Sequence, residues 1–213
     1  MKNAVFEKIS SLGIVPVIAV DNADKAIPLA DALAAGGLPV VEITFRTPAA
    51  AEVIAAIAKA RPEMTVGAGT VLSPETLKIA KDAGASFAVA PGLNPRVVKA
   101  AADLDMPFVP GVATPSEIEQ GLDFGLELLK FFPAEPMGGV KFLSSVYAPY
   151  KHTGVKFMVT GGISAEGAAD WLACPAVAAV GGSWMAKSAE IAAGQWGEIT
   201  AKCRAAAALR KLS

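Results

Sequence analysis

Hydrophobic and polar positions follow two alternating patterns along this chain. Short runs rich in valine, isoleucine and phenylalanine predict buried strands, and longer alanine-rich segments with apolar residues three or four positions apart predict helices between them. The predicted strands lie near Ile14–Val20, Val40–Phe45, Thr65–Ala68, Phe87–Ala90, Phe108–Val109, Leu126–Phe131, Lys156–Thr160 and Ala178–Val180. The predicted helices lie near Asp24–Ala35, Pro48–Ala60, Pro74–Ala83, Pro95–Ala102, Pro115–Gly121, Gly139–Tyr147, Ala165–Leu172 and Trp196–Lys211.

Several helix ends carry their own sequence signals. A capping residue followed by proline marks four starts, because the cap accepts a free backbone N–H and proline needs none at the first helical position. These pairs are Thr47-Pro48, Ser73-Pro74, Asn94-Pro95 and Thr114-Pro115, with Ser164 as a further candidate cap. Glycines at Gly36-Gly37 and Gly84 are typical of left-handed helix ends.

Eight strand–helix units without a dividing linker predict an α/β fold, a (β/α)8 TIM barrel that forms one domain over residues 1–213. The segment Lys2–Ser11 predicts an additional amphipathic helix that covers the floor of the barrel. Because enzymes with this fold place their chemistry at the C-terminal ends of the strands, we expect the reactive side chains there.

Composition narrows the class of protein. The chain has 213 residues, is 53% apolar and carries a net charge of −1 with acids and bases interspersed, which argues against a nucleic-acid surface. No apolar stretch reaches the roughly 18 residues of a membrane span, and no signal peptide is evident. Cys174 and Cys203 fit reduced thiols, so we expect a cytoplasmic protein.

The sequence contains few residues that could form a histidine-based metal site or catalytic triad. The two cysteines lack the spacing of metal ligands, and His152 is the only histidine. It lies in a polar stretch that predicts a surface loop. We therefore expect neither a metal site built on histidine nor a Ser-His-Asp triad.

Lys130 occupies an unusual position, at the end of the apolar run Leu126–Phe131. Alternation along the strand places it on the same face as Leu128 and Phe132. A buried ammonium without a partner tends to lose its proton, and the neutral amine is a nucleophile toward carbonyl groups. The alternative is a lysine at a strand end whose head group reaches solvent.

The second predicted strand carries polar residues on one face. Glu42, Thr44 and Arg46 alternate with Val41, Ile43 and Phe45, so the polar set points toward the barrel axis or its mouth. A carboxylate and a guanidinium inside a barrel are costly unless they are used. Glu42 comes within plausible reach of Lys130 as an acid–base partner; the alternative is a structural Glu–Arg pair at the rim.

Glycine turns follow three predicted strands. Gly69-Thr70 ends the third strand, Gly161-Gly162 the seventh and Gly181-Gly182-Ser183 the eighth. Backbone N–H groups in such turns approach anions closely, and the last two loops are where this fold often holds phosphate. Pro91 follows the fourth strand, either as a rigid turn or as an apolar wall of the mouth.

With these residues in view, the chain resembles the family of 2-keto-3-deoxy-6-phosphogluconate (KDPG) and 2-keto-4-hydroxyglutarate (KHG) aldolases. The likeness runs in one order from about residue 5 to residue 190. The blocks Glu42–Thr44 and Lys130–Glu135 are specific to the family, whereas the glycine turns alone are not. The matching stretches include Val41–Thr47, Gly67–Leu72, Ala90–Leu93, Lys130–Glu135, Gly138–Lys141, Thr160–Ile163 and Gly181–Trp184. One departure is Met158-Val159, where relatives often have an X-Pro pair.

The resemblance implies a class I aldolase that cleaves KDPG to pyruvate and glyceraldehyde 3-phosphate, and KHG to pyruvate and glyoxylate, without a metal or other cofactor. It implies a homotrimer. It also assigns roles. Lys130 would form the Schiff base and Glu42 would shuttle protons. Arg46 and Thr70 would bind the substrate carboxylate, and Pro91 and Phe132 would line the pocket. The phosphate would be bound by Gly161, Gly162 and Ser183.

Two other interpretations remain open at this point. One is a phosphate-binding barrel isomerase or synthase in which Lys130 is an electrostatic contact only. The other is a barrel that serves as a non-catalytic or engineered assembly subunit, suggested by alanine-rich runs such as Ala49–Ala60 that leave helix faces poor in charge.

Overall fold

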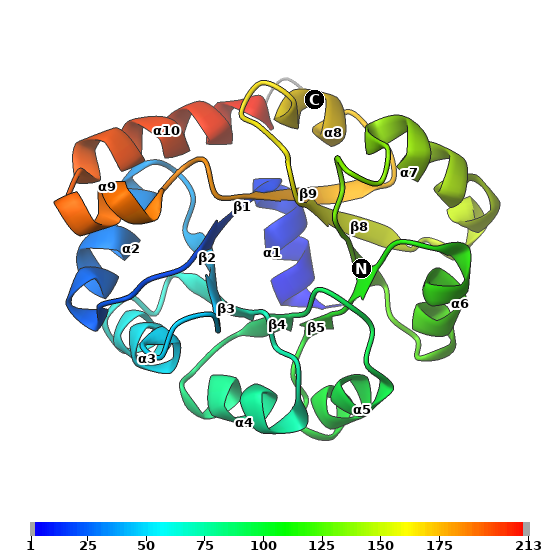
Figure 1. The fold of residues 1–213 in the computed structure, drawn as a ribbon, viewed down its shortest axis with the longest axis horizontal. Helices are drawn as coiled ribbons and strands as arrows, with labels where there is room; N and C mark the ends of the chain where they lie inside the picture. The colour runs from blue at the N-terminus through cyan, green and yellow to red at the C-terminus, as the bar shows by residue number, and fades with distance from the viewer. Residues whose placement is uncertain (1–2, 211–213) are drawn as a thin grey trace.

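The computed structural model describes residues 3–210 as a ring of parallel strands surrounded by helices (Figure 1). The strands are β1 Ile14–Ile18, β2 Val40–Thr44, β3 Thr65–Gly69, β4 Phe87–Val89, β5 Phe108–Val109, β6 Gly111–Val112, β7 Leu128–Phe131, β8 Lys156–Thr160 and β9 Val177–Gly182. The helices are α1 Ala4–Leu12, α2 Ala26–Ala35, α3 Ala50–Ala60, α4 Pro74–Asp82, α5 Pro95–Asp103, α6 Pro115–Asp123, α7 Gly139–Tyr147, α8 Ala168–Leu172, α9 Ser188–Ala193 and α10 Trp196–Leu209. Two 3-10 turns, η1 Ala23–Lys25 and η2 Ala148–Thr153, complete the set.

The predicted (β/α)8 barrel is confirmed. The sheet runs in the order β5-β4-β3-β2-β1-β9-β8-β7-β6, and every pairing is parallel. Its two outermost strands, β5 and β6, are consecutive in the chain and separated only by Pro110, which has no N–H to donate. The carbonyl of Pro110 accepts from the backbone N–H of Lys130 at 2.8 Å. Together β5 and β6 therefore fill one strand position and close the ring.

The inside of the barrel is apolar toward the N-terminal ends of the strands. Val40, Leu128 and Met158 pack there with Phe6 and Ile9 from α1, which lies across the centre of the ring in Figure 1. Asn3 caps this helix by accepting from the N–H of Val5 at 2.9 Å. The predicted helix over the barrel floor is confirmed within the described residues; Lys2, its predicted first residue, lies outside them.

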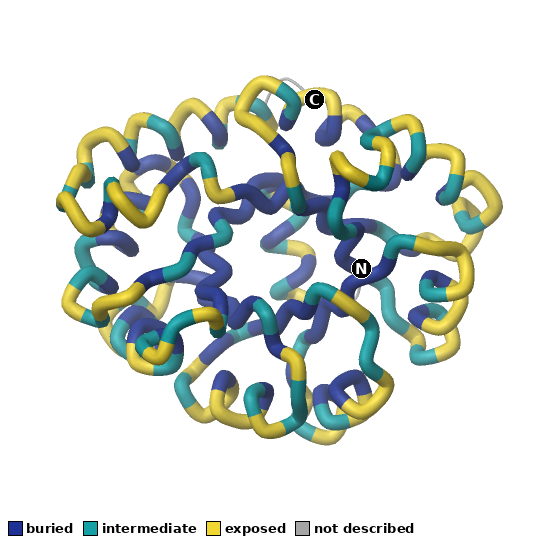
Figure 2. Tube along the Cα trace, viewed as in Figure 1, coloured by how far each residue is buried: buried dark blue, intermediate teal, exposed yellow. Residues whose placement is uncertain are grey.

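A larger hydrophobic layer fills the space between the strands and the outer helices. Ile43, Leu29, Phe131 and Trp171 belong to it, and all are almost fully buried. Figure 2 shows the same division, with buried backbone along the ring and exposed backbone on the outer sides of the helices. Among the described residues, no helix combines the length and apolar character needed to cross a membrane.

Most of the predicted helix boundaries hold. Ser73, Asn94 and Thr114 each cap a helix that begins with proline, and Thr114 forms a capping box with Glu117. The prediction for Thr47 is wrong: α3 begins at Ala50, and the Thr47 hydroxyl donates to the carbonyl of Val20 at 2.7 Å. Gly37 and Gly84 end their helices with positive φ angles of 85° and 93°, as predicted.

Smaller differences lie near the C-terminal half. The seventh strand of the chain starts at Leu128 rather than Leu126, and α8 starts at Ala168 after a turn in which Ser164 Oγ accepts from the N–H of Gly167. Helix α9 was not predicted, because its six residues are too few to show a helical period. Lys211, at the end of the last predicted helix, lies outside the described residues.

Candidate active site

A cavity of about 350 Å³ opens at the C-terminal ends of the strands, where the sequence predicted the chemistry. All of the predicted site residues line it, and they come from six strand ends and the turns that follow them. They are Glu42, Arg46, Thr70, Pro91, Lys130, Phe132, Gly161, Gly162 and Ser183. The fold thus gathers residues as far apart in the chain as Glu42 and Ser183 into one site.

Lys130 and Glu42 form the polar centre of this cavity. Lys130 is 6% exposed and Glu42 is 1% exposed, and Nζ lies 3.8 Å from Oε1. Nζ also lies 5.2 Å from the centre of the Phe132 ring. Among the described residues, the second carboxylate oxygen of Glu42, Oε2, has no hydrogen-bond partner. Such a buried, loosely paired charge is costly for folding, so its presence indicates a chemical use.

The local sequence explains why both side chains point inward. On β2, Val40, Glu42 and Thr44 share the inner face, and on β7 Leu128 and Lys130 do so. Val40 and Leu128 belong to the apolar packing of the barrel interior. Each strand thus packs an apolar residue on the barrel floor and presents its polar residue one step higher, beneath the cavity.

Arg46 lies at the rim, just past the end of β2, and is exposed. Its Nε donates to Thr44 Oγ1 at 3.1 Å, and the Thr44 hydroxyl donates to the carbonyl of Ile18 at 3.4 Å. This chain of hydrogen bonds ties the guanidinium to β1. A planar guanidinium held at a cavity mouth suits a carboxylate ligand, which it can bind through two N–H groups.

Thr70 and Pro91 complete the mouth on the side of β3 and β4. Thr70 has a φ of 59°, in the left-handed region that residues other than glycine rarely occupy. Strained backbone of this kind concentrates at functional sites. Both Thr70 and Pro91 are partly buried and line the cavity.

The turn after β8 contains two consecutive glycines in the left-handed region of backbone conformation. Gly161 and Gly162 have φ angles of 105° and 80°, so their conformation is one that side-chain-bearing residues rarely adopt. Left-handed residues in a turn can direct backbone N–H groups into a shared concavity that receives anions. β8 and β9 pair with Thr160 opposite Gly181, so the Gly182-Ser183 turn lies beside this one. Ser183 is exposed at the cavity edge.

Sequence reasoning gave no role to three residues that line the cavity: Val17, Thr160 and Ile163. It did direct Thr44 toward the barrel axis or its mouth and placed Gly181 and Gly182 in a turn suited to anions, and all three line the cavity. Thr160 stands out, because it is 5% exposed and its hydroxyl has no hydrogen-bond partner among the described residues. Alternation along β8 places it on the same face as Met158, which packs inside the barrel. That alternation is the signal that could have identified it.

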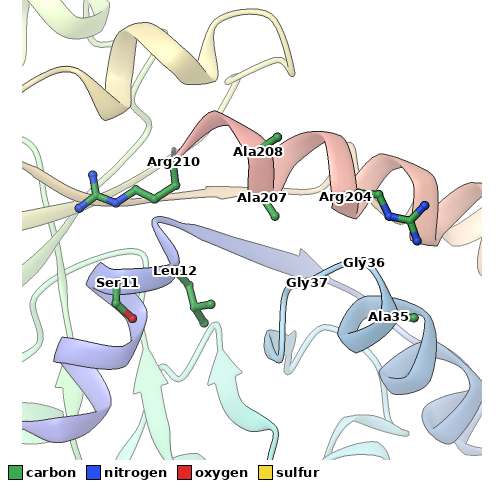
Figure 3. Close-up of a pocket in the computed structure, with 9 residues that line it drawn as sticks. All are labelled: Ser11, Leu12, Ala35, Gly36, Gly37, Arg204, Ala207, Ala208 and Arg210. Carbon is green, nitrogen blue, oxygen red and sulfur yellow. The ribbon is translucent and has the colours of Figure 1, made fainter. Parts of the chain in front are cut away.

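A second cavity, of about 450 Å³, lies at the opposite end of the barrel, between α1, α2 and α10 (Figure 3). It is lined mainly by small and apolar residues, together with Arg204 and Arg210. The two arginine side chains extend away from each other along α10, so they do not converge on one point. Within residues 3–210, no three histidine, cysteine, aspartate or glutamate side chains come close enough to hold a metal ion.

The sequence of this chain matches a known family over most of its length. The family model "KDPG and KHG aldolase" matches residues 5–202. This chain belongs to the KDPG and KHG aldolase family. The 2-dehydro-3-deoxy-phosphogluconate aldolase of Haemophilus influenzae is 48% identical to this member over 92% of the chain and 91% of the relative. The KHG/KDPG aldolase of Escherichia coli strain K12 is 46% identical over 93% and 92%.

Solved structures of the KDPG and KHG aldolases share the fold. The KDPG aldolase of Legionella pneumophila, with pyruvate captured as a covalent carbinolamine intermediate, superposes with a TM-score of 0.91. It is 36% identical in sequence, and the alignment covers 96% of this chain and 98% of the Legionella chain.

Proposed function

We propose that this protein is a class I aldolase that cleaves KDPG to pyruvate and glyceraldehyde 3-phosphate, with residues 1–213 acting as one domain. The observation that carries the proposal is the buried Lys130 amine 3.8 Å from the Glu42 carboxylate, at the base of an open cavity. The carbinolamine in the Legionella relative supports it, because that intermediate joins pyruvate to the protein covalently.

The reaction begins when Lys130, as a free amine, attacks the C2 ketone of the substrate. A bond forms between Nζ and C2, and the amine proton passes to the former carbonyl oxygen, which gives a carbinolamine. Protonation and loss of that oxygen as water leave a protonated imine. Glu42 is the nearest carboxylate to Nζ, and we assign these proton transfers to it, through a water molecule.

Cleavage uses the imine as an electron sink. Glu42 takes the proton from the C4 hydroxyl, the bond between C3 and C4 breaks, and its electrons move into the imine to form an enamine. The aldehyde, glyceraldehyde 3-phosphate, departs. Protonated Glu42 returns its proton to C3, and water then hydrolyses the imine to release pyruvate and the Lys130 amine. Because the imine accepts the electrons, this sequence of steps needs no metal ion.

Binding groups surround the reacting atoms on both sides. Arg46 and Thr70 hold the substrate carboxylate, and Pro91 and Phe132 form the walls of the cavity. Gly161, Gly162 and Ser183 receive the phosphate at the other end. Fixing both ends of the substrate aligns the bond to be broken with the imine, which is a large part of the catalytic advantage of a bound reactant.

KHG is the second substrate we propose, cleaved to pyruvate and glyoxylate. It has the same keto-acid portion and so uses Lys130, Glu42 and Arg46, but it has no phosphate for the glycine turns. The name of the E. coli relative, KHG/KDPG aldolase, supports this double use. The buried Lys130–Glu42 pair has no purpose in a non-catalytic assembly subunit, which weighs against that alternative.

We further propose that the protein acts as a homotrimer in the cytoplasm. Two large apolar side chains support an association: Leu72, directly before α4, is 58% exposed, and Ile79, on α4, is 51% exposed. Contacts between copies would remove such side chains from water. Light scattering on the purified protein tests the trimer, because a monomer or dimer mass would contradict it.

Aldol cleavage itself is tested by incubating the protein with KDPG and following pyruvate through lactate dehydrogenase and NADH. We expect pyruvate and glyceraldehyde 3-phosphate in equal amounts from the wild type, and no pyruvate from Lys130→Ala. Formation of an isomer of KDPG without pyruvate would instead favour an isomerase, and absence of any turnover would favour the assembly subunit.

A further inference from the structure

Glu135 and Trp171 lie outside the cavity lining, and Glu135 contacts the turn that we assign to phosphate. We propose that the Glu135–Trp171 pair fixes the conformation of Gly161 and Gly162, which makes Glu135 a positioning residue for phosphorylated substrates. This inference rests on the proposed function, because it assigns a role relative to the phosphate end of KDPG.

The side chains of the pair meet directly. Oε1 of Glu135 accepts a hydrogen bond from Nε1 of Trp171 at 2.6 Å. Trp171 is 1% exposed, on α8, and its ring packs against Phe131, with 6.3 Å between the ring centres. A buried indole N–H without an acceptor is costly, so the Glu135 carboxylate is the group that satisfies it.

The backbone of Glu135 contacts the glycine turn at the same time. Its N–H donates to the carbonyl of Gly161 at 3.0 Å, and the preceding N–H of Ala134 donates to the carbonyl of Thr160 at 2.8 Å. A Cβ atom placed on Gly162 would lie 2.9 Å from Cβ of Glu135. Glu135 therefore packs against both glycines of the turn.

Glu135 precedes the Gly161-Gly162 turn in the sequence, and Trp171 follows it. Trp171 lies on α8, the helix that follows the turn, and Glu135 lies on the segment that follows Lys130 and β7. A Cβ atom on Gly139 would lie 3.5 Å from Oε2 of Glu135, so the carboxylate rests against the first residue of α7. The start of a helix stabilises a negative charge, which helps to keep this carboxylate in place.

Positioning matters here because glycine is the most flexible residue. Gly161 and Gly162 have access to many conformations, and only some of them direct their N–H groups to one anion. A turn that is fixed before the substrate arrives spends less of the binding energy on ordering. The benefit goes to a substrate that carries phosphate, and a substrate without phosphate gains none.

The test compares KDPG with KHG as substrates for Glu135→Ala, Trp171→Phe and the double variant. We expect the KM for KDPG to rise about tenfold in each variant, in line with the loss of one charge-assisted hydrogen bond. We expect kcat/KM for KHG to change less than about twofold, because its shorter chain ends in a carboxylate at C5 and carries no phosphate for the turn. The double variant should lose little more than either single variant, since both remove the same contact.

Two further variants separate positioning from general damage. Glu135→Gln retains an acceptor for the Trp171 N–H and should restore the KM for KDPG to near the wild-type value. Tyr150→Phe is the matched control: it removes a hydrogen bond of 2.9 Å from Tyr150 to Glu119, neither of which lines the cavity, and should leave the ratio between the two substrates unchanged.

Equal losses on KDPG and KHG, or an unchanged KM for KDPG in Glu135→Ala, would overturn the positioning role. Thermal unfolding of each variant accompanies the kinetics, and Glu135→Ala carries the test if Trp171→Phe fails to fold. Failure of the proposed function would look different, because the wild type itself would then produce no pyruvate from either substrate.

Discussion

A Cβ atom on Gly69 would lie 2.2 Å from Oε1 of Glu42, so the carboxylate occupies the space that any larger residue at position 69 would need. Gly69 is the last residue of β3 and pairs with Thr44 on β2. Position 69 therefore requires glycine because the Glu42 side chain fills the space beside it. It lets the Glu42 side chain lie along the barrel wall with Oε1 3.8 Å from the Lys130 amine.

Gly69→Ala is expected to displace the Glu42 carboxylate and to lower kcat for KDPG cleavage by about a hundredfold, the usual contribution of a positioned acid–base group. Steady-state kinetics and circular dichroism together measure the effect on a folded protein. Gly197→Ala, where a new Cβ meets nothing within 4 Å, serves as the control and should retain full activity. An active Gly69→Ala variant would show that Glu42 is not needed where it lies.

Arg46→Lys should weaken binding of the keto acid and leave stability unchanged. Lysine keeps the positive charge but loses the planar pair of N–H groups and the hydrogen bond from Nε to Thr44. We expect the KM for KDPG to rise about tenfold, the equivalent of one lost charge-assisted hydrogen bond. The opposite pattern, an unchanged KM with a lower melting temperature, would assign Arg46 a structural role only.

We expect the Glu117 carboxyl to contribute to stability in a pH-dependent way. Burial alone would raise the pKa of this carboxyl, but hydrogen bonds from the N–H of Ala113 and from the hydroxyl and N–H of Thr114 outweigh it and lower the pKa below its ordinary value of 4.5. A lowered pKa in the folded state means that this stability is present above pH 4.5 and is lost as the pH falls through the folded value.

Glu117→Gln should therefore reduce the free energy of unfolding by about 0.5 kcal/mol at pH 7, the typical worth of a negative charge in the first turn of a helix. The difference from wild type should shrink as the pH falls below 4.5, and it should vanish below the lowered folded pKa, where the carboxyl is protonated in both states of the chain. Urea denaturation at pH 7 and below pH 4.5 measures it. Asp123→Asn, an exposed change at the other end of the same helix, should not reduce stability; a constant difference at every pH would contradict the account.

Cys203 should be unreactive in the folded protein. It lies on α10, faces Gly36 at the end of α2 and is 0% exposed. Burial raises the pKa of its thiol to about 12, so almost none of the reactive thiolate is present at pH 8. Iodoacetamide followed by peptide mass spectrometry should label Cys203 only after denaturation. Rapid labelling at pH 8 under native conditions would show that this interface opens.

The architecture was within reach of the sequence because each signal was local. Capping residues before prolines, glycines after helices and the alternation of Glu42 with Val41 and Ile43 all act over a few positions. The same alternation placed Lys130 inside the barrel. It required only that a strand present its residues to opposite faces in turn.

The remaining features depend on contacts between distant segments. Thr47 caps no helix, because its hydroxyl bonds to Val20 across two neighbouring strands, and no local pattern reports that competition. The bond between Glu135 and Trp171 joins residues 36 positions apart. A sequence without its fold gives no sign that such residues meet.

The central claim is that the Lys130 amine forms a covalent bond with the keto acid. Borohydride reduction of the protein with pyruvate, followed by peptide mass spectrometry, tests it most directly. Reduction of the imine should add one pyruvate-derived group to the peptide that contains Lys130 in the wild type, and none in Lys130→Ala. A wild-type protein that gains no adduct, or gains it on another lysine, would contradict the account.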